Sequence, residues 1–240
     1  MTNSGPDRDP IDMGWLALAT GILPLFVVNT AYLISIAGDH IPKCIPYIEG
    51  CTSISAAGRY GLSYFFFKAG MIPAAVLLAA FWIFCRRWLL VLGDTDGRMV
   101  RAMVFTGCIS AAFLILYSVF LGSDGEFYGL MRRYGVNIYF SFGYLAQLIL
   151  LGRLQHLKKG GLISLPQGLL TGKLTLMIVM LLLGLGSIPL SDVFTDVHRP
   201  RNIVEWNFSV LMISYYFLTW RAWQHTGFSI TPEIRLRTHE

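Results

Sequence analysis

Six long apolar stretches constrain this chain more than any other feature. They cover roughly residues 13–37, 61–85, 101–122, 136–152, 172–190 and 203–223. A helix needs about 20 apolar residues to cross the roughly 30 Å hydrocarbon core of a bilayer. Membrane-spanning strands are excluded, because no short segments alternate between apolar and polar residues. The sequence therefore predicts an all-α, polytopic membrane protein with six transmembrane helices.

The composition agrees with a protein that has lipid for much of its solvent. The chain has 240 residues, of which 55% are hydrophobic and 14% charged, and its mean hydropathy is +0.57. A soluble domain usually carries about 25% charged residues. Soluble, disordered, collagenous and coiled-coil classes are excluded on these figures. The formal net charge of +5 is expected to set membrane topology and is not interpreted as a nucleic-acid-binding surface.

Three parts follow from the apolar pattern: an N-terminal segment over residues 1–12, a six-helix membrane domain over 13–223 and a polar, basic tail over 224–240. The first apolar stretch is interpreted as a retained helix. Asp7, Asp9 and Asp12 precede it with a single Arg8, whereas a cleaved signal peptide begins with positive charge.

Basic residues are distributed unequally between the predicted loops. Apart from Lys68, which lies inside the second stretch, 12 lie on the side of the two termini and 6 on the other. Cytoplasmic loops carry the excess of Lys and Arg, so both termini are predicted to be cytoplasmic. The larger set is Arg8, Arg86, Arg87, Arg98, Arg101, Arg153, Lys158, Lys159, Lys173, Arg221, Arg235 and Arg237, and the smaller is Lys43, Arg59, Arg132, Arg133, Arg199 and Arg201.

Tryptophans are placed at the predicted membrane interfaces. This interpretation applies to Trp82, Trp88, Trp220 and Trp223 at the cytoplasmic ends of the second and sixth stretches, and to Trp206 at the outer end of the sixth. An indole ring has an apolar body and one N–H group that needs a polar partner, which favours such positions.

Two of the four cysteines lie in the first predicted outer loop. Cys44 and Cys51 are separated by six residues that include Pro46 and Gly50. An outer compartment is oxidising, and a loop of this composition can close. We predict a disulfide between them. No metal-site spacing is present among the cysteines, and no cofactor is predicted.

The fifth predicted loop, on the same side, leaves two interpretations open. Asp192, Asp196 and His198 are candidate ligands of a divalent cation, with Asp39 and His40 of the first loop able to complete the set. The alternative is that they are solvated loop residues that help to cap the next helix.

Lys68 is the charge least expected in an apolar stretch. It lies about 10 Å below the predicted outer surface, given the rise of an α-helix. Buried charges in membranes usually face the bundle interior with a partner, for which Glu205 is the best candidate and Asp192 the second. The alternative is that Lys68 extends its amine to the interface.

A lipid-headgroup contact is the functional interpretation of these outer charges. The arginines Arg132 and Arg133 of the third loop are suited to bidentate binding of phosphate. The predicted lipid-binding residues are Lys68, Arg199, Arg201, Glu205 and Trp206.

An enzyme is the less favoured class. No Gly-x-Ser-x-Gly, His-Glu-x-x-His or phosphate-binding-loop motif is present. If the protein modifies lipids, Asp192 or Glu205 is the candidate general base and His198 the candidate acid–base partner. A third interpretation is a non-catalytic membrane scaffold, in which the polar residues only join helices.

Several short motifs resemble the DRAM/FRAG/Sfk family of membrane proteins. They are Ile45-Pro46-Tyr47-Ile48-Glu49 in the first loop, Ser141-Phe142-Gly143 in the fourth stretch, and Glu205-Trp206 followed by Tyr215-Tyr216-Phe217-Leu218-Thr219 in the last. The resemblance implies six helices with both termini inside and a role in handling membrane lipids. The chain departs from the family at Gly50-Cys51-Thr52-Ser53, where members usually have Asp-Thr-Gly.

The expected partners are therefore membrane lipids, with membrane proteins as further possible partners and no nucleic acid. The expected location is a membrane: the inner membrane of a bacterial cell, or otherwise an endomembrane or the plasma membrane.

Overall fold

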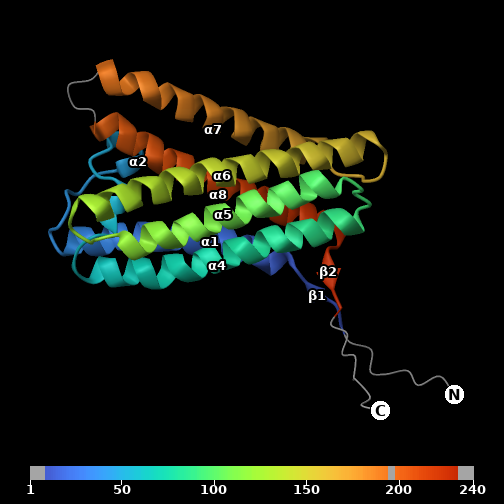
Figure 1. Ribbon diagram of the computed structural model, residues 1–240, viewed down its shortest axis with the longest axis horizontal. Coiled ribbons are helices and arrows are strands. Elements are labelled where there is room, and N and C mark those ends of the chain that lie inside the picture. The colour runs from blue at the N-terminus through green and yellow to red at the C-terminus, as the bar shows by residue number, and fades with distance from the viewer. Residues whose placement is uncertain (1–8, 194–197, 232–240) are drawn as a thin grey trace, which may run out of the picture.

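Six long helices form one elongated bundle in the computed structural model (Figure 1). The structure describes residues 9–193 and 198–231, and it describes no side chains for residues 187–198. The long helices are α1 (Gly14–Ala37), α4 (Gly61–Val91), α5 (Gly97–Phe120), α6 (Glu126–Lys159), α7 (Gln167–Val193) and α8 (His198–Thr226).

Short elements mark the two ends of the bundle. Residues 38–60, here called the cap, connect α1 to α4 and contain α2 (Pro46–Glu49) and α3 (Ile54–Ala57). The opposite end, here called the strand end, carries the antiparallel pair of β1 (Ile11–Asp12) and β2 (Ser229–Ile230). The first and last described elements therefore lie at the same end.

Five of the described helices, α1, α4, α5, α6 and α7, are long and apolar enough to cross a membrane. This finding confirms the prediction of a polytopic all-α membrane protein in its coarse form. The six predicted stretches all coincide with long helices, but most of the helices extend beyond them. The largest difference is α6, which covers residues 126–159 in place of the predicted 136–152.

Helix α8 lies alongside the other helices but is too polar to count among these five. Its polar side chains bond to its neighbours in the bundle. The Tyr215 hydroxyl donates to the carbonyl of Gln147 on α6 at 2.7 Å, and the Gln147 amide donates to the carbonyl of Met212 at 3.1 Å. A helix that satisfies polar groups inside a bundle needs less apolar surface than one that faces lipid.

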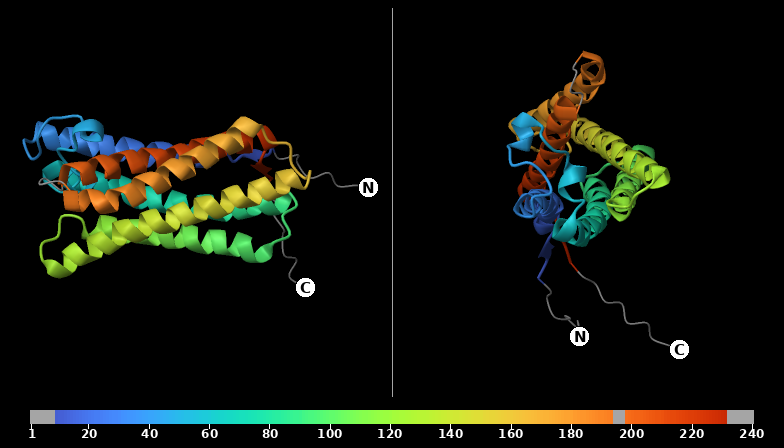
Figure 2. Two further views of the ribbon diagram at one scale, coloured as in Figure 1. Left: turned by 90° about the horizontal axis from the view of Figure 1, so that it is seen from above. Right: turned by 90° about the vertical axis from the view of Figure 1, so that its left-hand side faces the viewer.

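Helix α7 is the outermost of the long helices. The end-on view in Figure 2 shows it beyond α8. Within the described part of its apolar window only 22% of residues are buried, the lowest share of the five helices. One side of α7 is therefore available to lipid or to another molecule.

Aromatic side chains fill the core, and this corrects their predicted placement at the interfaces. Trp82, Trp206 and Trp223 are fully buried, and Trp88 is 1% exposed. Phe81 packs between Trp223 and Tyr216, with ring centroids at 5.5 and 5.1 Å. These rings contribute packing area between α4 and α8 and do not anchor the protein in the headgroup layer.

The predicted position of Lys173 in a basic loop is also wrong, because Lys173 lies in the bundle. Its side chain is fully buried on α7. The Nζ atom donates to the Thr219 hydroxyl at 2.6 Å and lies 3.5 Å from the centre of the Tyr215 ring. No carboxylate among the described residues forms an ion pair with it.

Replacing Thr219 with Val is expected to lower the free energy of unfolding by about 1–3 kcal/mol, because the buried Lys173 nitrogen loses its closest hydrogen-bond partner. Replacing Lys173 with Met is expected to leave that free energy unchanged or to raise it, since an apolar side chain of similar length removes the need for a partner. Denaturant unfolding in detergent micelles measures both. A larger loss in the Met variant than in the Val variant would contradict this account.

Candidate functional site

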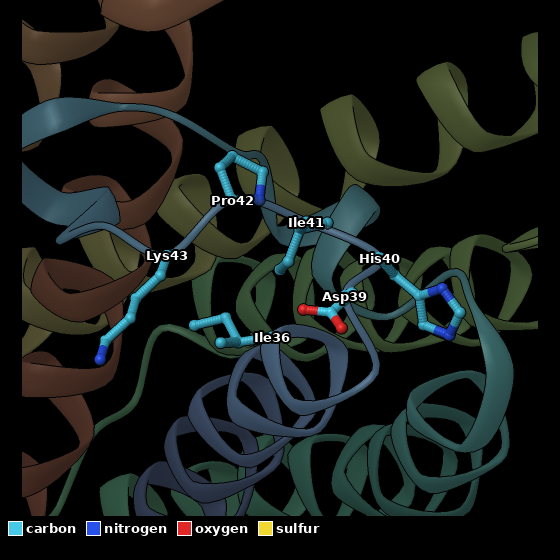
Figure 3. A pocket seen from close by; sticks show the side chains of 6 residues that line it. All are labelled: Ile36, Asp39, His40, Ile41, Pro42 and Lys43. Atoms are coloured by element: carbon cyan, nitrogen blue, oxygen red, sulfur yellow. The ribbon is translucent and has the colours of Figure 1, made fainter.

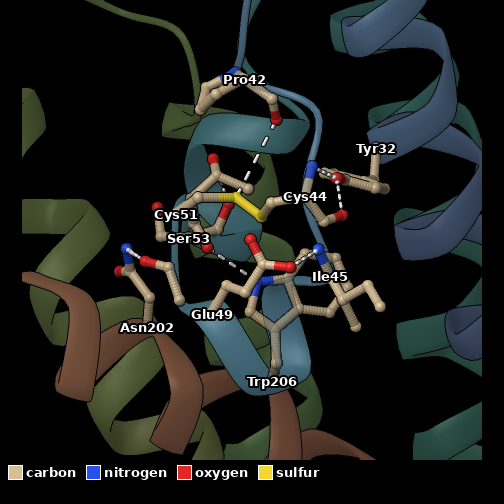
Figure 4. Close-up of a disulfide and its surroundings, with 11 residues drawn as sticks. Tyr32, Pro42, Cys44, Ile45, Glu49, Cys51, Ser53, Asn202 and Trp206 are labelled. Atoms are coloured by element: carbon tan, nitrogen blue, oxygen red, sulfur yellow. Dashed lines mark hydrogen bonds between the residues drawn. A yellow bond between two sulfur atoms is a disulfide. The ribbon is translucent and has the colours of Figure 1, made fainter.

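The cap is closed by the predicted disulfide between Cys44 and Cys51, which is confirmed (Figure 4). Tyr32 of α1 holds one side of this loop, because its hydroxyl accepts from the Cys44 N–H at 3.1 Å and donates to the Cys44 carbonyl. The Glu49 carboxylate accepts from the Ile45 N–H at 3.2 Å. The loop is therefore fixed to α1 as well as cross-linked.

Helix α8 holds the other side of the cap through side chain to backbone hydrogen bonds. Asn202 donates to the Gly50 carbonyl at 2.8 Å, Trp206 to the Thr52 carbonyl at 2.9 Å and Asn207 to the Tyr47 carbonyl at 2.7 Å. The Trp206 ring also packs edge-on against Tyr47, with centroids at 5.0 Å. Trp206 thus positions the cap and is too buried to contact lipid directly.

At the base of the cap, polar side chains of the cap meet others from α5, α6 and α8; we call Ser55, Arg59, Tyr117, Arg132 and Glu205 the polar cluster. The Ser55 hydroxyl on α3 shares a 2.8 Å hydrogen bond with the buried Tyr117 hydroxyl on α5. The Glu205 carboxylate on α8 accepts from the backbone N–H groups of Ile54 and Ser55. Glu205 therefore orients the start of α3, and α3 in turn presents Ser55 to Tyr117.

Two arginines complete the polar cluster. Arg59 follows α3 in the cap, and Arg132 lies in the second turn of α6. Both positive charges are within electrostatic range of the Tyr117 hydroxyl, and the two arginines are also within range of each other. Like charges repel. Asp124 acts on Arg132 electrostatically but forms no ion pair with it, so an anion between the two arginines would be stabilised.

The described hydrogen bonds satisfy these arginines only in part. Arg132 donates to the carbonyls of Phe120 and Ser123 at the end of α5. Arg59 has a buried Nε atom without a hydrogen-bond partner. Neither arginine is in an ion pair among the described residues, where the only acidic partners of an arginine are Asp94 and Asp96, both bonded to Arg153.

Lys68 does not pair with Glu205, and that prediction is wrong. Its Nζ atom donates to the Tyr64 hydroxyl at 2.6 Å and to the Val119 carbonyl at 2.8 Å. Lys68 and Arg132 thus both bind carbonyl groups at the C-terminal end of α5, where backbone acceptors lack partners within the helix. This places a third cation near the cap end, next to the polar cluster but outside it.

The remaining predicted lipid-binding residues lie at the start of α8. Arg201 is exposed and acts electrostatically on Glu205. Arg199 is exposed, and its carbonyl lies against Gly50 of the cap. These two arginines thus surround the cap on its α8 side.

The side chains of Asp192, Asp196 and His198, the candidate cation ligands of the fifth predicted loop, lie outside the described residues. Asp39 and His40 line an open hollow of about 520 Å³ in the cap (Figure 3). His40 points away from Asp39 there and packs against Tyr60, with centroids at 5.6 Å. No group of three potential ligands occurs among the described residues.

Sequence reasoning missed the polar cluster as a unit. The distribution of basic residues gives Arg59 only a topological role, and no sequence motif contains Ser55 or Tyr117. The available signal was a tyrosine in the outer half of an apolar stretch, which needs a partner for its hydroxyl. That partner lies 62 residues away in sequence, so only the fold identifies it.

No family model, curated protein or solved structure matches the chain.

Proposed function

We propose that this protein binds the phosphate group of a membrane lipid at the polar cluster, on the outer side of the membrane. The observation that carries the proposal is the proximity of Arg59 to Arg132: Arg59 has an unpartnered buried nitrogen, and neither arginine is in an ion pair among the described residues. Guanidinium groups bind phosphate through two parallel hydrogen bonds, and a phosphate would neutralise the repulsion between the two arginines.

The proposed topology has six membrane-spanning helices, with both termini in the cytoplasm and the cap outside. Three observations support it: α8 accompanies the five apolar helices, β1 and β2 lie at one end, and the disulfide lies at the other. Disulfides persist in oxidising compartments outside the cytoplasm. The polar cluster then lies at the level of the outer headgroups.

In this proposal each residue of the polar cluster has a distinct task. Arg59 and Arg132 bind phosphate oxygens, and the hydrogen-bonded pair of the Ser55 and Tyr117 hydroxyls offers one further O–H donor beside them. Glu205 makes no contact with the lipid; it fixes α3 through two backbone N–H groups. Lys68, Arg199 and Arg201 add positive potential at the rim, which favours anionic headgroups.

The function proposed is binding and organisation of lipid, without catalysis. A lipid-modifying reaction would need Asp192 or Glu205 as base with His198, and Glu205 is already occupied by backbone donors. Membership of the DRAM/FRAG/Sfk family, with its link to lipid handling, remains part of the proposal. The same is true of the particular membrane and of any membrane-protein partner.

Native mass spectrometry of the full chain in mild detergent tests this function. The probe is dioctanoyl phosphatidylglycerol, and dioctanoylglycerol serves as the same lipid without phosphate. Arg59→Gln and Arg132→Gln should each weaken the phospholipid complex about 10-fold or more, since hydrogen bonds to charged groups contribute about 1.5–3 kcal/mol. Dioctanoylglycerol binding should not change.

Arg133→Gln is the matched control, because Arg133 is the exposed neighbour of Arg132 on the same helix and carries the same charge. It should leave the affinity within about twofold of wild type. Equal losses of affinity in all three variants would show that only general charge attraction holds the phospholipid, which would refute the site. Unchanged affinity in all three would also refute it.

A further inference from the structure

A groove separates α7 from α8 in the part of the bundle nearer the strand end. Its volume is about 780 Å³, within the range of small-molecule sites. Thr171, Gly172 and Thr175 of α7 form one wall, and Ser214, Phe217 and Leu218 of α8 form the other. This groove lies far from the cap, so it is distinct from the polar cluster.

Small side chains keep this groove open. A Cβ atom added at Gly172 would lie 3.4 Å from Leu218, in ordinary contact, and one at Gly168 would meet no atom within 4 Å. Helix α7 is also the outermost helix (Figure 2), and the groove is open rather than enclosed, so it faces the surroundings of the bundle. In a membrane those surroundings are hydrocarbon chains.

Positive charge lies at the strand end of the groove. Gln167, which lines the groove, accepts a hydrogen bond from the Lys158 Nζ atom at 2.9 Å. Arg221 is exposed on α8, three and four residues beyond Leu218 and Phe217, and therefore continues the same face of the helix by one turn. Residues 158–186 and 206–231 contain no Asp or Glu.

We infer that the α7–α8 groove binds one molecule of an anionic phospholipid from the leaflet at the strand end. An acyl chain would lie along the groove, and the phosphate would meet Lys158 and Arg221. The charge complementarity selects this occupant: apolar walls lead directly to two cations without a neighbouring carboxylate in the sequence of either helix. The site goes beyond the proposed function and serves the opposite leaflet.

Native mass spectrometry with dioleoyl phosphatidylglycerol tests this inference in the Arg59→Gln/Arg132→Gln background, which removes the proposed site at the cap. Thr171→Trp and Gly168→Leu fill the groove and should each weaken binding at least 10-fold. Arg221→Gln should weaken phosphatidylglycerol binding about 10-fold and leave the weaker binding of dioleoylglycerol, which has no phosphate, within twofold. Failure of the cap site alone would not change these results.

Two control variants match the size and charge changes. Leu182→Trp places the same bulk on an exposed position of α7 outside the groove, and Arg87→Gln removes an exposed charge at the strand end of α4. Both should bind as the background does. Equal binding in the groove-filled variants and the background would overturn the inference. A change of oligomeric state in Thr171→Trp would overturn it too, because it would identify a second copy of the chain as the occupant.

Discussion

Replacing Arg153 with Met is expected to destabilise the protein by about 3–5 kcal/mol, because Asp94 is left buried without its partner. Arg153 binds both oxygens of Asp94, through Nε at 2.8 Å and Nη2 at 2.6 Å, and it reaches Asp96 at 3.1 Å. Asp94 is only 4% exposed. This pair ties the loop between α4 and α5 to the strand end of α6, and denaturant unfolding in micelles measures its loss.

Arg98→Met provides the control for this prediction, since Arg98 is exposed in the first turn of α5. It should change the free energy of unfolding by about 0.5 kcal/mol or less. The double variant Asp94→Asn/Arg153→Met should recover part of the loss, because the amide carries no charge. A double variant less stable than Arg153→Met would contradict the account.

The same pair predicts an acid-dependent loss of stability. Burial raises the pKa of the Asp94 carboxyl, but the hydrogen bonds and charge of Arg153 and the Asp96 N–H lower it more, so the net pKa lies below its usual value. A lowered folded-state pKa stabilises the protein above the unfolded value of about 3.9, and the stabilisation is lost as the pH falls through the folded pKa. Stability in Asp94→Asn/Arg153→Met should depend less on pH in this acid range.

Gly50→Ala is expected to detach the cap from α8. Gly50 has φ +61°, and an added Cβ atom would come within 2.2 Å of the Arg199 carbonyl oxygen. Left-handed backbone strain and the clash together should destabilise the cap by about 2–5 kcal/mol. Hydrogen exchange of the amides in residues 44–53 should accelerate, and a reductant should open the Cys44–Cys51 disulfide faster.

Gly227→Ala isolates the contribution of the clash. Gly227 has φ +62°, almost the same backbone conformation, but a Cβ atom there would meet nothing within 4 Å. That variant should suffer only the backbone strain of about 1–2 kcal/mol and leave exchange in the cap unchanged. If Gly50→Ala left cap exchange equally unchanged, the docking of the cap on α8 would not depend on Gly50.

The helices were predictable because each leaves a local signal in the sequence. A run of about 20 apolar residues is sufficient to predict α1, α4 and α5, and two cysteines in a short loop predicted the disulfide. The ends of α6 were not predictable in this way. Its first turns contain Arg132 and Arg133 and its last turn contains Lys158 and Lys159, so hydropathy ends before the helix does.

The interior could not be predicted, because it depends on which helix faces meet. Trp82 and Trp223 had the sequence positions of interfacial residues, but packing of α4 against α8 buries them. Lys173 is the second residue of the fifth apolar stretch and is counted with the loop cations, but α7 begins six residues before it and carries it into the bundle. Neither helix alone contains this information.

The candidate site, like the fold, was predictable from the sequence only in part. The predicted outer charges Lys68 and Glu205 do lie at the cap end, as their positions in the apolar stretches required. Their partners are set by contacts over long sequence separations: Val119 for Lys68, and Ile54 and Ser55 for Glu205. The proximity of Arg59 in the cap to Arg132 on α6 is set by the fold, and no spacing in the sequence encodes it.

The most direct test of phosphate binding is solid-state NMR of the full chain in phosphatidylglycerol-containing bilayers, with ¹⁵N-labelled arginine guanidinium groups and natural ³¹P in the lipid. The account predicts ³¹P dephasing of guanidinium signals in wild type. The dephasing should be clearly reduced in Arg59→Gln/Arg132→Gln and should not be reduced in Arg133→Gln. Full retention of the wild-type dephasing in the double variant would contradict the proposal that these two arginines hold a lipid phosphate.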